Sequence, residues 1–352
     1  MAKTFLSEGE RMKILVTGGA GFIGSHICEH YAREGNEVIA FDDLGRARML
    51  KIPTELQELA FYNWNYLKEY KQIRLVQGDV RDLDRILKLI DDVEIIFHTA
   101  GQVAVTTSII DPLTDYNINA YGTLNVCESA RRSKGDPLIL FCSTNKVYGD
   151  LNLPLVELDE RYAYKDINGI NEKYPLEANC PYGASKISAE MILQSYFKTY
   201  GIPTIRARLS CIYGPRQLGC EDQAWIAHFV ISTLTRKPIT IFGDGKQVRD
   251  ILYVTDLVRA LVSLAENKNT TIGGVYNIGG GPENSTSLLE TLELLSEFTG
   301  LRSRIEFSDW RVGDQRIYVS DISKVHDSTN WKPLVNIKDG ISNLVNWYTS
   351  NL

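Results

Sequence analysis

Two side chains that could exchange a proton with a substrate, Tyr182 and Lys186, are four residues apart in a segment expected to be helical. At this spacing they lie on one face of the helix. The ammonium group of Lys186 would stabilise the phenolate of Tyr182 and lower a pKa that is ordinarily about 10. An upstream hydroxyl, that of Thr144, could hold a substrate oxygen beside that phenolate. We therefore expect Tyr182 to exchange protons with the substrate at neutral pH.

A second group of residues could bind a diphosphate. Gly18, Gly21 and Gly24 follow the apolar run that begins at Ile14, and the pair Phe22-Ile23 opens an expected helix. In a turn from strand to helix, glycines at this spacing allow a tight turn, a close approach of the backbone to a pyrophosphate and close packing of the helix on the strand. The helix N-terminus adds free N–H groups and a partial positive charge. The segment therefore predicts a dinucleotide site.

A carboxylate at the end of the next expected strand indicates which dinucleotide. Asp42 stands 18 residues after Gly24, where a carboxylate accepts hydrogen bonds from the ribose hydroxyls and repels a 2′-phosphate. This position favours NAD over NADP. Arg46 and Arg48 lie just downstream and could hold a phosphate, so NADP stays open as an alternative.

The elements that must position these residues alternate between strands and helices. We expect strands from residue 14 and over 37–41, 73–77, 94–97 and 138–141, with helices over 22–34 and 117–133. This alternation predicts a parallel sheet, whose ligands bind at the carboxyl ends of the strands. Asp79 and Val80 are then placed to contact adenine, and Ala100 and Gly101 to pass under the rest of the cofactor. We interpret His98, also at a strand end, as a packing residue.

The predicted fold is α/β, with a Rossmann-type doubly wound parallel sheet and a smaller C-terminal α/β domain that binds substrate. Residues 1–11 form an N-terminal extension, residues 12–190 the dinucleotide-binding domain and residues 191–352 the substrate domain, from which 204–212 returns to the main sheet. An aromatic-rich insertion at 49–70 has no evident role. The long stretch at 150–180 is a candidate lid or substrate loop.

Composition excludes several classes of function. The 352 residues are 44% apolar, enough for a sizeable core, and the net charge of −6 argues against a nucleic-acid surface. No apolar run approaches the roughly 18 residues of a membrane span, and the polar N-terminus lacks the apolar stretch of a signal peptide, so we expect a cytoplasmic protein. The six cysteines include no CxxC pair, which favours reduced thiols over disulfides and predicts no metal site.

Together these motifs resemble the extended short-chain dehydrogenase/reductase family of nucleotide-sugar epimerases and dehydratases, over about residues 12–347. The resemblance implies a catalytic group of Thr144, Tyr182 and Lys186. It also implies bound NAD, contacted by Gly18, Gly21, Phe22, Ile23, Gly24, Asp42, Asp43, Asp79, Val80, Ala100, Gly101, Asn119, Tyr182 and Lys186. The substrate would be a nucleotide-diphosphate sugar. Candidate phosphate ligands are Arg216, Arg249, Arg311 and Arg316, and candidate sugar contacts are Gln102, Thr106, Thr107, Asn145 and Lys146.

Smaller features distinguish members of the family. Its dehydratases carry two carboxyl groups after the strand, in a T-D-E motif, whereas this chain has Thr144-Asn145-Lys146, so dehydration is not expected. Segments 101–109, 143–150 and 245–250 resemble the members that epimerise a CDP-hexose at C2, converting CDP-paratose to CDP-tyvelose. Cys211 stands where many relatives have an asparagine near the sugar nucleotide, and we interpret it as a small buried residue.

The resulting hypothesis is epimerisation at C2 by transient oxidation to a 2-keto sugar, with CDP-hexose as the preferred substrate. Three alternatives stay open: a 4-epimerase of a UDP- or CDP-hexose, a 2-epimerase of a non-deoxy sugar nucleotide such as CDP-glucose, and a non-catalytic NAD-sensing protein. The resemblance also implies a homodimer or homotetramer paired through helices at 119–133 and 182–200.

Overall fold

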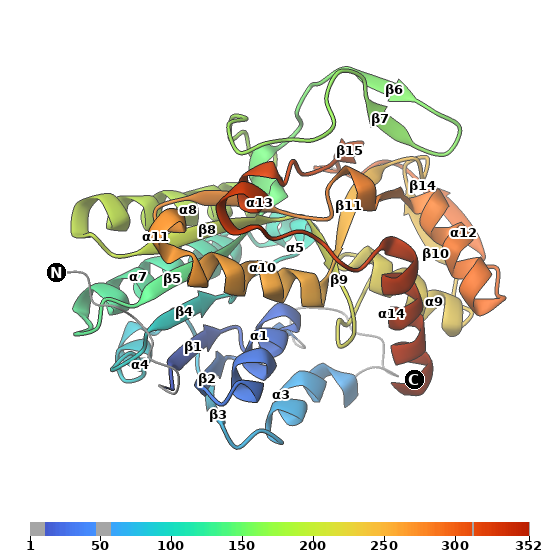
Figure 1. Cartoon of the computed structure of the whole chain (residues 1–352). Helices are drawn as coiled ribbons and strands as arrows, with labels where there is room; N and C mark the ends of the chain where they lie inside the picture. Colours follow the sequence, from blue (N-terminus) through green and yellow to red (C-terminus); the bar gives the residue numbers. More distant parts are fainter. Residues whose placement is uncertain (1–10, 47–57, 312, 352) are drawn as a thin grey trace.

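A seven-stranded parallel sheet forms the centre of the computed structural model, which describes residues 11–46, 58–311 and 313–351 (Figure 1). Arg48, residues 49–57 of the insertion and residues 1–10 of the expected N-terminal extension lie outside the described residues. The strand order is β12-β8-β5-β4-β1-β2-β3. In chain order the strands are β1 Lys13–Thr17, β2 Glu37–Asp42, β3 Ile73–Gln77, β4 Ile95–His98, β5 Leu138–Thr144, β8 Thr204–Leu209 and β12 Val275–Ile278.

Helices cover both faces of this sheet, which confirms the doubly wound fold. On one face α1 (Phe22–Arg33) and α10 (Val254–Glu266) pack their apolar side chains against the strands. On the other face lie α4 (Leu83–Leu87), α7 (Gly122–Arg132) and α8 (Pro181–Tyr200). The strands are apolar on both sides because both faces are buried. The chain order reverses between β1 and β4, and a sheet of this type binds ligands at that point.

The expected strand over 204–212 divides into two strands in two sheets. β8 ends at Leu209 and stays in the main sheet, whereas β9 (Cys211–Tyr213) pairs with β11 (Val248–Tyr253) in a second sheet. Ser210 lies between them and donates a hydrogen bond from Oγ to the backbone carbonyl of Asp250, at 2.9 Å. β12 also returns to the main sheet, beside β8, which the sequence reading did not predict.

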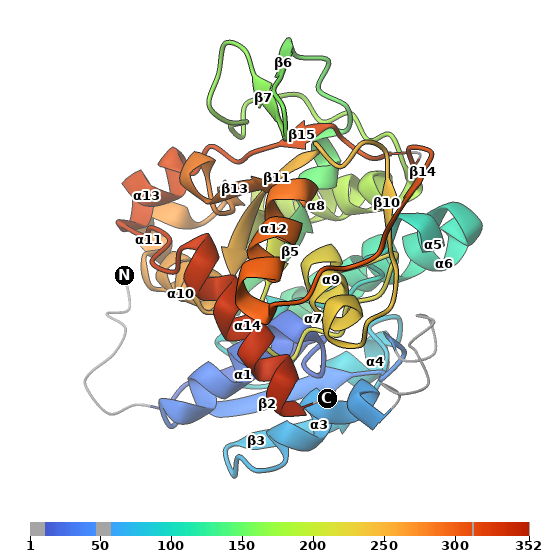
Figure 2. The same cartoon turned by 90° about the vertical axis from the view of Figure 1, so that its right-hand side faces the viewer.

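The remaining elements complete the second sheet, form two separate two-stranded sheets, and add helices and turns to both halves of the chain (Figure 2). They are η2 Glu58–Phe61, α3 Tyr62–Leu67, α5 Val105–Ile110, α6 Pro112–Tyr116, η3 Asn117–Tyr121, η4 Asn145–Tyr148, β6 Leu155–Glu157, β7 Tyr162–Tyr164, α9 Trp225–Leu234, β10 Ile239–Phe242, α11 Lys268–Thr271, η5 Pro282–Asn284, β13 Ser285–Ser287, α12 Leu288–Thr299, β14 Ile305–Ser308, β15 Ile317–Tyr318, α13 Ser323–Thr329 and α14 Ile337–Asn351. The expected helix over 117–133 begins as the π-helical turn η3 before it continues as α7.

Both long insertions act as packing elements in the described part of the chain. In α3 and the residues after it, Tyr66 and Tyr70 donate hydroxyl hydrogen bonds to Glu29 on α1, at 2.7 and 3.1 Å. Residues 150–180 form the hairpin β6–β7 at the top of the molecule, where Tyr162 donates to Asp244 (Figure 1). No residue of 150–180 lines the main cavity in this structure, and a role as a lid or substrate loop stays a prediction.

Two expectations about surfaces and ligands can be examined in the same residues. None of the helices in the described part of the chain is long and apolar enough to cross a membrane. Within those same residues there is no group of three or more side chains suited to hold a metal ion.

The helices expected at a subunit interface expose Tyr121, Met191 and Tyr200. Pairing of two chains through them stays a prediction.

His98 at the end of β4 is a packing residue, as we interpreted it from the sequence. Its ring is 1% exposed and forms hydrogen bonds with the hydroxyls of Thr17 (2.7 Å) and Thr123 (2.9 Å). Burial, assisted by the positive charge of Lys186, lowers the pKa of His98 to about 3. The ring is therefore neutral in the folded protein at neutral pH, and it links β1, β4 and α7.

This burial predicts an acid-sensitive contribution to stability. The unfolded state takes up a proton at His98 near pH 6.5, whereas the folded state does so only near pH 3, so the contribution is complete above pH 6.5 and is lost as the pH falls toward 3. Replacing His98 with Gln should reduce the slope of unfolding free energy between pH 6 and 4 by up to about 1.4 kcal/mol per pH unit. Urea titrations at each pH measure it.

Two features of the chain make this comparison specific. Two partly buried histidines also have lowered pKa values: burial and Arg216 lower that of His26 to about 3, and burial lowers that of His228. Both contribute equally to the wild type and to His98→Gln. The half-exposed His326 provides the matched control, as His326→Gln. Equal pH slopes in the wild type and His98→Gln would show that His98 is not held neutral.

Candidate functional site

A large cavity of about 500 Å³ lies at the carboxyl ends of the central strands. Gly18, Asp42 and Asp79 line it from the strands of the first half of the chain. Arg249 and Arg311 line it from the second half. The cavity therefore lies where the predicted dinucleotide-binding and substrate domains meet.

The glycine turn brings backbone close to backbone. Gly18 has a φ of +71°, and a Cβ atom there would lie 2.7 Å from the backbone nitrogen of Ala100. A Cβ on Gly24 would collide with the carbonyl oxygen of Gly18, so this glycine allows α1 to pack on the turn. Gly21 lines the cavity, and the nearest atom to an added Cβ would be the Gly18 oxygen at 3.0 Å. The turn is therefore open toward the cavity and closed toward the protein.

Asp42 at the end of β2 organises the loops on either side of it. Its carboxylate accepts hydrogen bonds from the backbone N–H groups of Ala20 (3.0 Å) and Leu44 (2.8 Å). Burial raises the pKa of Asp42, and these hydrogen bonds act in the opposite direction. Asp43 and Arg46 line the cavity beside it. Arg46, the described candidate for a 2′-phosphate ligand, donates from Nη2 to the carbonyl of Leu218 at 2.7 Å.

The residues expected near adenine lie at one end of the cavity. Asp79 and Val80 both line it. Burial opposes the ionisation of Asp79, but the guanidinium of Arg81, whose Nε lies 3.0 Å from both carboxylate oxygens, holds the pKa of Asp79 below its usual value. The carbonyl of Val80 accepts a hydrogen bond from Asn125 at 3.0 Å. This end of the cavity is thus fixed by α7.

Asn119 lies behind the cavity wall instead of in it. Its Nδ2 donates to the carbonyl of Gln102 (3.0 Å) and to Ser185 (3.0 Å), whereas its buried Oδ1 has no partner. A Cβ added to Gly101 would lie 2.9 Å from that oxygen and 3.2 Å from Nζ of Lys186. The missing side chain at Gly101 therefore leaves two buried polar groups close to the cavity. With the glycine cradle and Asp42, these residues fit a dinucleotide.

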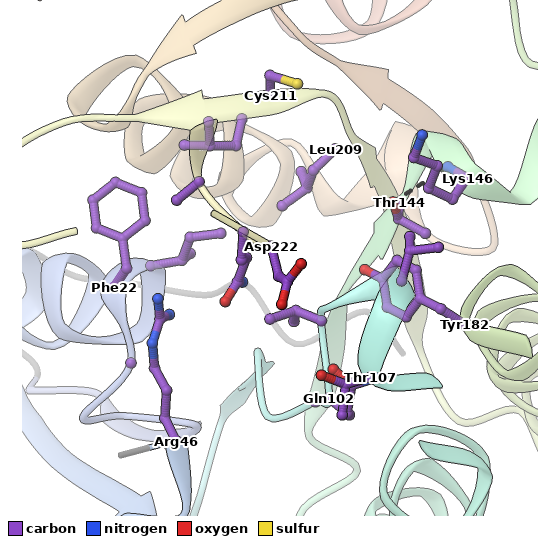
Figure 3. Close-up of a pocket in the computed structure, with 18 of the residues that line it drawn as sticks. Phe22, Arg46, Gln102, Thr107, Thr144, Lys146, Tyr182, Leu209, Cys211 and Asp222 are labelled. Atoms are coloured by element: carbon purple, nitrogen blue, oxygen red, sulfur yellow. Dashed lines mark hydrogen bonds between the residues drawn. The ribbon is translucent and has the colours of Figure 1, made fainter. Parts of the chain in front are cut away.

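Thr144, Tyr182 and Lys186 all line the cavity, so the structure brings the expected catalytic group together. Thr144 is the last residue of β5, while the other two lie in the first turns of α8. Figure 3 shows Thr144 and Tyr182 next to each other at one end of the cavity. Lys186 donates from Nζ to the carbonyl of Cys142 at 3.1 Å and lies 4.7 Å from the ring centre of Phe141.

The electrostatics of this group differ from the expectation in one respect. Burial raises the pKa of Tyr182 above its ordinary value, and a hydrogen bond with Thr144 opposes the shift. Burial also lowers the pKa of Lys186 to about 8, against the opposing effects of Cys142, Asp115 and Glu190. The expected net lowering of the Tyr182 pKa is not found in the protein alone, because desolvation of the phenolate is the largest effect on it.

A buried ion pair holds the face of α8 that carries these side chains. Glu190, one turn after Lys186, is fully buried, and its Oε2 lies 2.7 Å from Nη2 of Arg208 on β8. Ser143, adjacent to Thr144 on β5, donates to the same carboxylate at 2.6 Å. The i, i+4 spacing of Tyr182, Lys186 and Glu190 thus links the proposed chemistry to the two strands beneath it.

The wall of the cavity next to the catalytic group is rich in cations. Lys146 and Arg249 both face Asp314, with nitrogen–oxygen distances of 3.9 and 3.6 Å. Arg311 lies 3.6 Å from the ring centre of Phe242 and donates from Nη1 to the carbonyl of Glu221 at 3.0 Å. A set of cations on a buried wall suits the oxygens of a diphosphate. Lys146, expected near the sugar, lines the cavity together with Arg249 and Arg311, two of the candidate phosphate ligands, and their contacts with a ligand stay a prediction.

Two expected phosphate ligands lie elsewhere. Arg216 is buried outside this cavity, pairs with Glu29 at 2.8 Å and lies over the ring of Tyr66 at 4.4 Å. It joins the region after β9 to α1 and α3. Arg316 is exposed and does not line the cavity; it lies over the rings of Tyr162 and Trp310. The sequence alone does not show whether the guanidinium group of an arginine packs on an aromatic ring or binds a ligand.

The expected sugar contacts differ in whether their polar atoms already form hydrogen bonds within the protein. Gln102, Thr106, Thr107 and Asn145 all line the cavity. Both ends of the Gln102 amide are used within the protein, because Nε2 donates to Ala104 and Asp115 at 2.8 Å and Oε1 accepts from Ala104. The hydroxyl of Thr106 is buried without a partner and is available to a ligand.

Several cavity residues were not found from the sequence. They come from the stretch around α9, from β10 and from loops of the second half of the chain, and include Asp222, Gln223, Trp225, His228, Thr240, Gln247 and Asp314. No motif marks them, although Nε1 of Trp225 and Oε1 of Gln247 are buried without a partner, as groups that meet a ligand are. Cys211 also lines the cavity, and burial raises the pKa of its thiol, in keeping with a small neutral residue.

Comparison with known proteins agrees with this site. A model of the NAD dependent epimerase/dehydratase family matches residues 14–279. The CDP-paratose 2-epimerase of Salmonella typhi is 37% identical over 96% of this chain and 100% of its own length. A putative UDP-glucose 4-epimerase of Methanocaldococcus jannaschii is 33% identical over 96% of this chain and 99% of its own.

Solved structures give the same assignment. The UDP-glucuronic acid 4-epimerase from Bacillus cereus, in complex with UDP-glucuronic acid and NAD, superposes with a TM-score of 0.83 at 29% identity. The match covers 97% of this chain and 100% of that one. The chain belongs to the NAD-dependent epimerase/dehydratase family.

Proposed function

We propose that this protein epimerises a nucleotide sugar at C2, with conversion of CDP-paratose to CDP-tyvelose as the type reaction. The observation that carries the proposal is the full-length similarity to a CDP-paratose 2-epimerase, at 37% identity. The cavity supports it, because Asn145 and Lys146 follow Thr144 where elimination of water would need carboxyl groups. Inversion of a hydroxyl needs only one proton acceptor and a means of removing hydride.

This chain uses NAD, and its residues fit the two halves of that cofactor differently. The N–H groups at the glycine turn and the start of α1 would hold the pyrophosphate, and Asp42 would hold the ribose hydroxyls. When bound, NAD supplies an acceptor for hydride and returns it, so that no net oxidation remains. The protein must therefore hold the sugar while one of its carbons is planar.

Tyr182 is the residue proposed to move the proton at the C2 oxygen. As the phenolate it would accept the hydroxyl proton when the C2–H bond breaks, giving a 2-keto sugar. After the sugar turns to present its other face, the tyrosine would return the proton to the same oxygen. Its burial excludes water from that oxygen, and the raised pKa makes the phenol the stable form between turnovers.

Thr144 and Lys186 are proposed to position and tune this tyrosine. The Thr144 hydroxyl forms a hydrogen bond with Tyr182 that favours its phenolate, and it would also orient the reacting oxygen. Lys186 lies one helical turn away with a pKa of about 8, so its ammonium is present below that pH. A positive charge in this buried setting would stabilise the phenolate as it forms.

A specific observation favours one alternative, a 4-epimerase. Both a 33% identical relative and the superposed solved structure carry 4-epimerase names. The three catalytic side chains do not by themselves show which carbon of the sugar is oxidised. Epimerisation at C2 of a non-deoxy sugar nucleotide such as CDP-glucose also uses the same side chains.

Product assignment by NMR tests the proposal against these alternatives. The protein, loaded with NAD, is incubated separately with CDP-paratose, CDP-glucose and UDP-glucose. We expect inversion at C2 with CDP-paratose as the best substrate. Inversion at C4 of UDP-glucose would replace the proposal with the 4-epimerase, and bound NAD without turnover of any hexose would favour a sensing role.

Replacement of Tyr182 by Phe tests the role of the phenol. The loss of its only acid–base group should reduce kcat by about 10²- to 10⁴-fold. The cofactor content, measured by absorbance after denaturation, should be unchanged because the ring and the cavity wall remain. Tyr200→Phe, an exposed position on the same helix, is the matched control. Near-normal turnover of Tyr182→Phe would remove this residue from the mechanism.

A further inference from the structure

Two cations share one carboxylate on the substrate side of the cavity. Nζ of Lys146 lies 3.9 Å and Nη2 of Arg249 lies 3.6 Å from Oδ1 of Asp314. The side chains are 16%, 8% and 31% exposed for Lys146, Arg249 and Asp314 respectively, and all three line the cavity. The group therefore has more positive than negative charge on a largely buried wall.

This excess of charge has a cost that a ligand could remove. Burial and the charge of Arg249 lower the pKa of Lys146, and Asp314 offsets only part of the shift. A buried cation is stabilised when it is paired and hydrogen-bonded, and is costly otherwise. Besides Asp314, the partner that Lys146 reaches is the carbonyl oxygen of Gly313, at 3.3 Å from Nζ. An anion bound in the cavity would complete the pairing.

Lys146 also has a fixed relation to the proposed catalytic hydroxyl. It lies in the turn η4, directly after the strand that ends with Thr144. Its backbone N–H donates to Oγ1 of Thr144 at 3.2 Å. Figure 3 shows Thr144 between Lys146 and Tyr182. An anion held by Lys146 is therefore held close to the point where the sugar oxygen must bind.

In a nucleotide sugar, the distance between the bound phosphate and Thr144 determines which ring carbon can reach Thr144. The β-phosphate is bonded through oxygen to C1, so C2 is the next ring carbon, whereas C4 lies across the ring. A phosphate anchored near Thr144 leaves C2 within reach of Thr144 and Tyr182. Reaction at C4 would need the phosphate to lie a ring's width farther away.

We propose that Lys146 binds the β-phosphate of the nucleotide sugar and thereby places C2, not C4, against Thr144 and Tyr182. Lys146 is then a positioning residue that determines regiochemistry. This inference rests on the proposed 2-epimerase function. It adds a residue and a reason for the choice of carbon, which the catalytic group leaves open.

The test compares two nucleotides that differ by one phosphate. Affinities of the NAD-loaded protein for CDP and for CMP are measured by calorimetry for the wild type, Lys146→Met, Lys146→Arg and the exposed control Lys134→Met. Loss of a charge-assisted contact should weaken CDP binding by about 10- to 100-fold in Lys146→Met. CMP binding should change by less than about twofold, because CMP lacks the phosphate that Lys146 would contact. Lys146→Arg should recover most of the loss.

The identity of the products provides a second readout, which would not change if Lys146 had only a structural role. In Lys146→Met, turnover of CDP-paratose should yield, beside the C2 epimer, the C4 epimer or a released keto sugar, both visible by NMR. If Lys146→Met binds CDP as the wild type does and forms only the C2 epimer, the inference is wrong and the proposed function stands. If CDP and CMP weaken equally, Lys146 only supports the fold of the wall, and the inference is again wrong.

The two proposals can fail separately. Wild-type protein that inverts C4 of a hexose would overturn the proposed function through its product alone. The ratio of CDP to CMP affinity is measured without turnover, so it still decides whether Lys146 contacts the β-phosphate.

Discussion

The buried ion pair between Glu190 on α8 and Arg208 on β8 is the interaction on which the site depends most. The carboxylate is completely buried, and besides Arg208 it accepts a hydrogen bond from Ser143 at 2.6 Å. Removing one member of such a pair leaves an uncompensated charge in the interior, which typically costs about 3–5 kcal/mol. The pair therefore fixes the rotation of α8, and with it the direction in which Tyr182 and Lys186 point.

Burial of the catalytic group has two opposing effects on the proposed reaction. Desolvation raises the pKa of Tyr182 and lowers that of Lys186 to about 8, so burial opposes the charged forms of both groups. The phenolate is thus a state that the site must stabilise during the reaction, with Thr144 already in contact. A dry site strengthens every such interaction. The cation at Lys186 then has the largest effect where charge develops.

Much of the first half of the chain could be predicted from the sequence because its signals are local. Gly18, Gly21 and Gly24 form a motif within a single turn from strand to helix, and the strand at 73–77 was predicted at the bounds of β3. Asp42 follows from its position at a strand end. The catalytic group could be predicted for the same reason, since two of its members share one helix face.

The second half was harder to predict because its contacts link distant segments. Arg216 reads as a phosphate ligand until the structure places it on Tyr66 and Glu29, which are more than a hundred residues earlier. The four residues of β12 contain no pattern that indicates its return to the main sheet. The pKa of Tyr182 required the depth of burial, which spacing alone does not give. Local spacing predicts neighbours on one element, whereas these features depend on the tertiary packing.

The central claim is a transient ketone at C2, and the fate of the C2 hydrogen tests it most directly. CDP-paratose carrying deuterium at C2 is incubated with the NAD-loaded protein in ordinary water until substrate and product reach equilibrium. If hydride leaves C2 and returns to the same carbon within a closed site, mass spectrometry will find the label in the product after many turnovers. Loss of the deuterium to water would contradict this account, because it would mean that C2 gives up a proton instead.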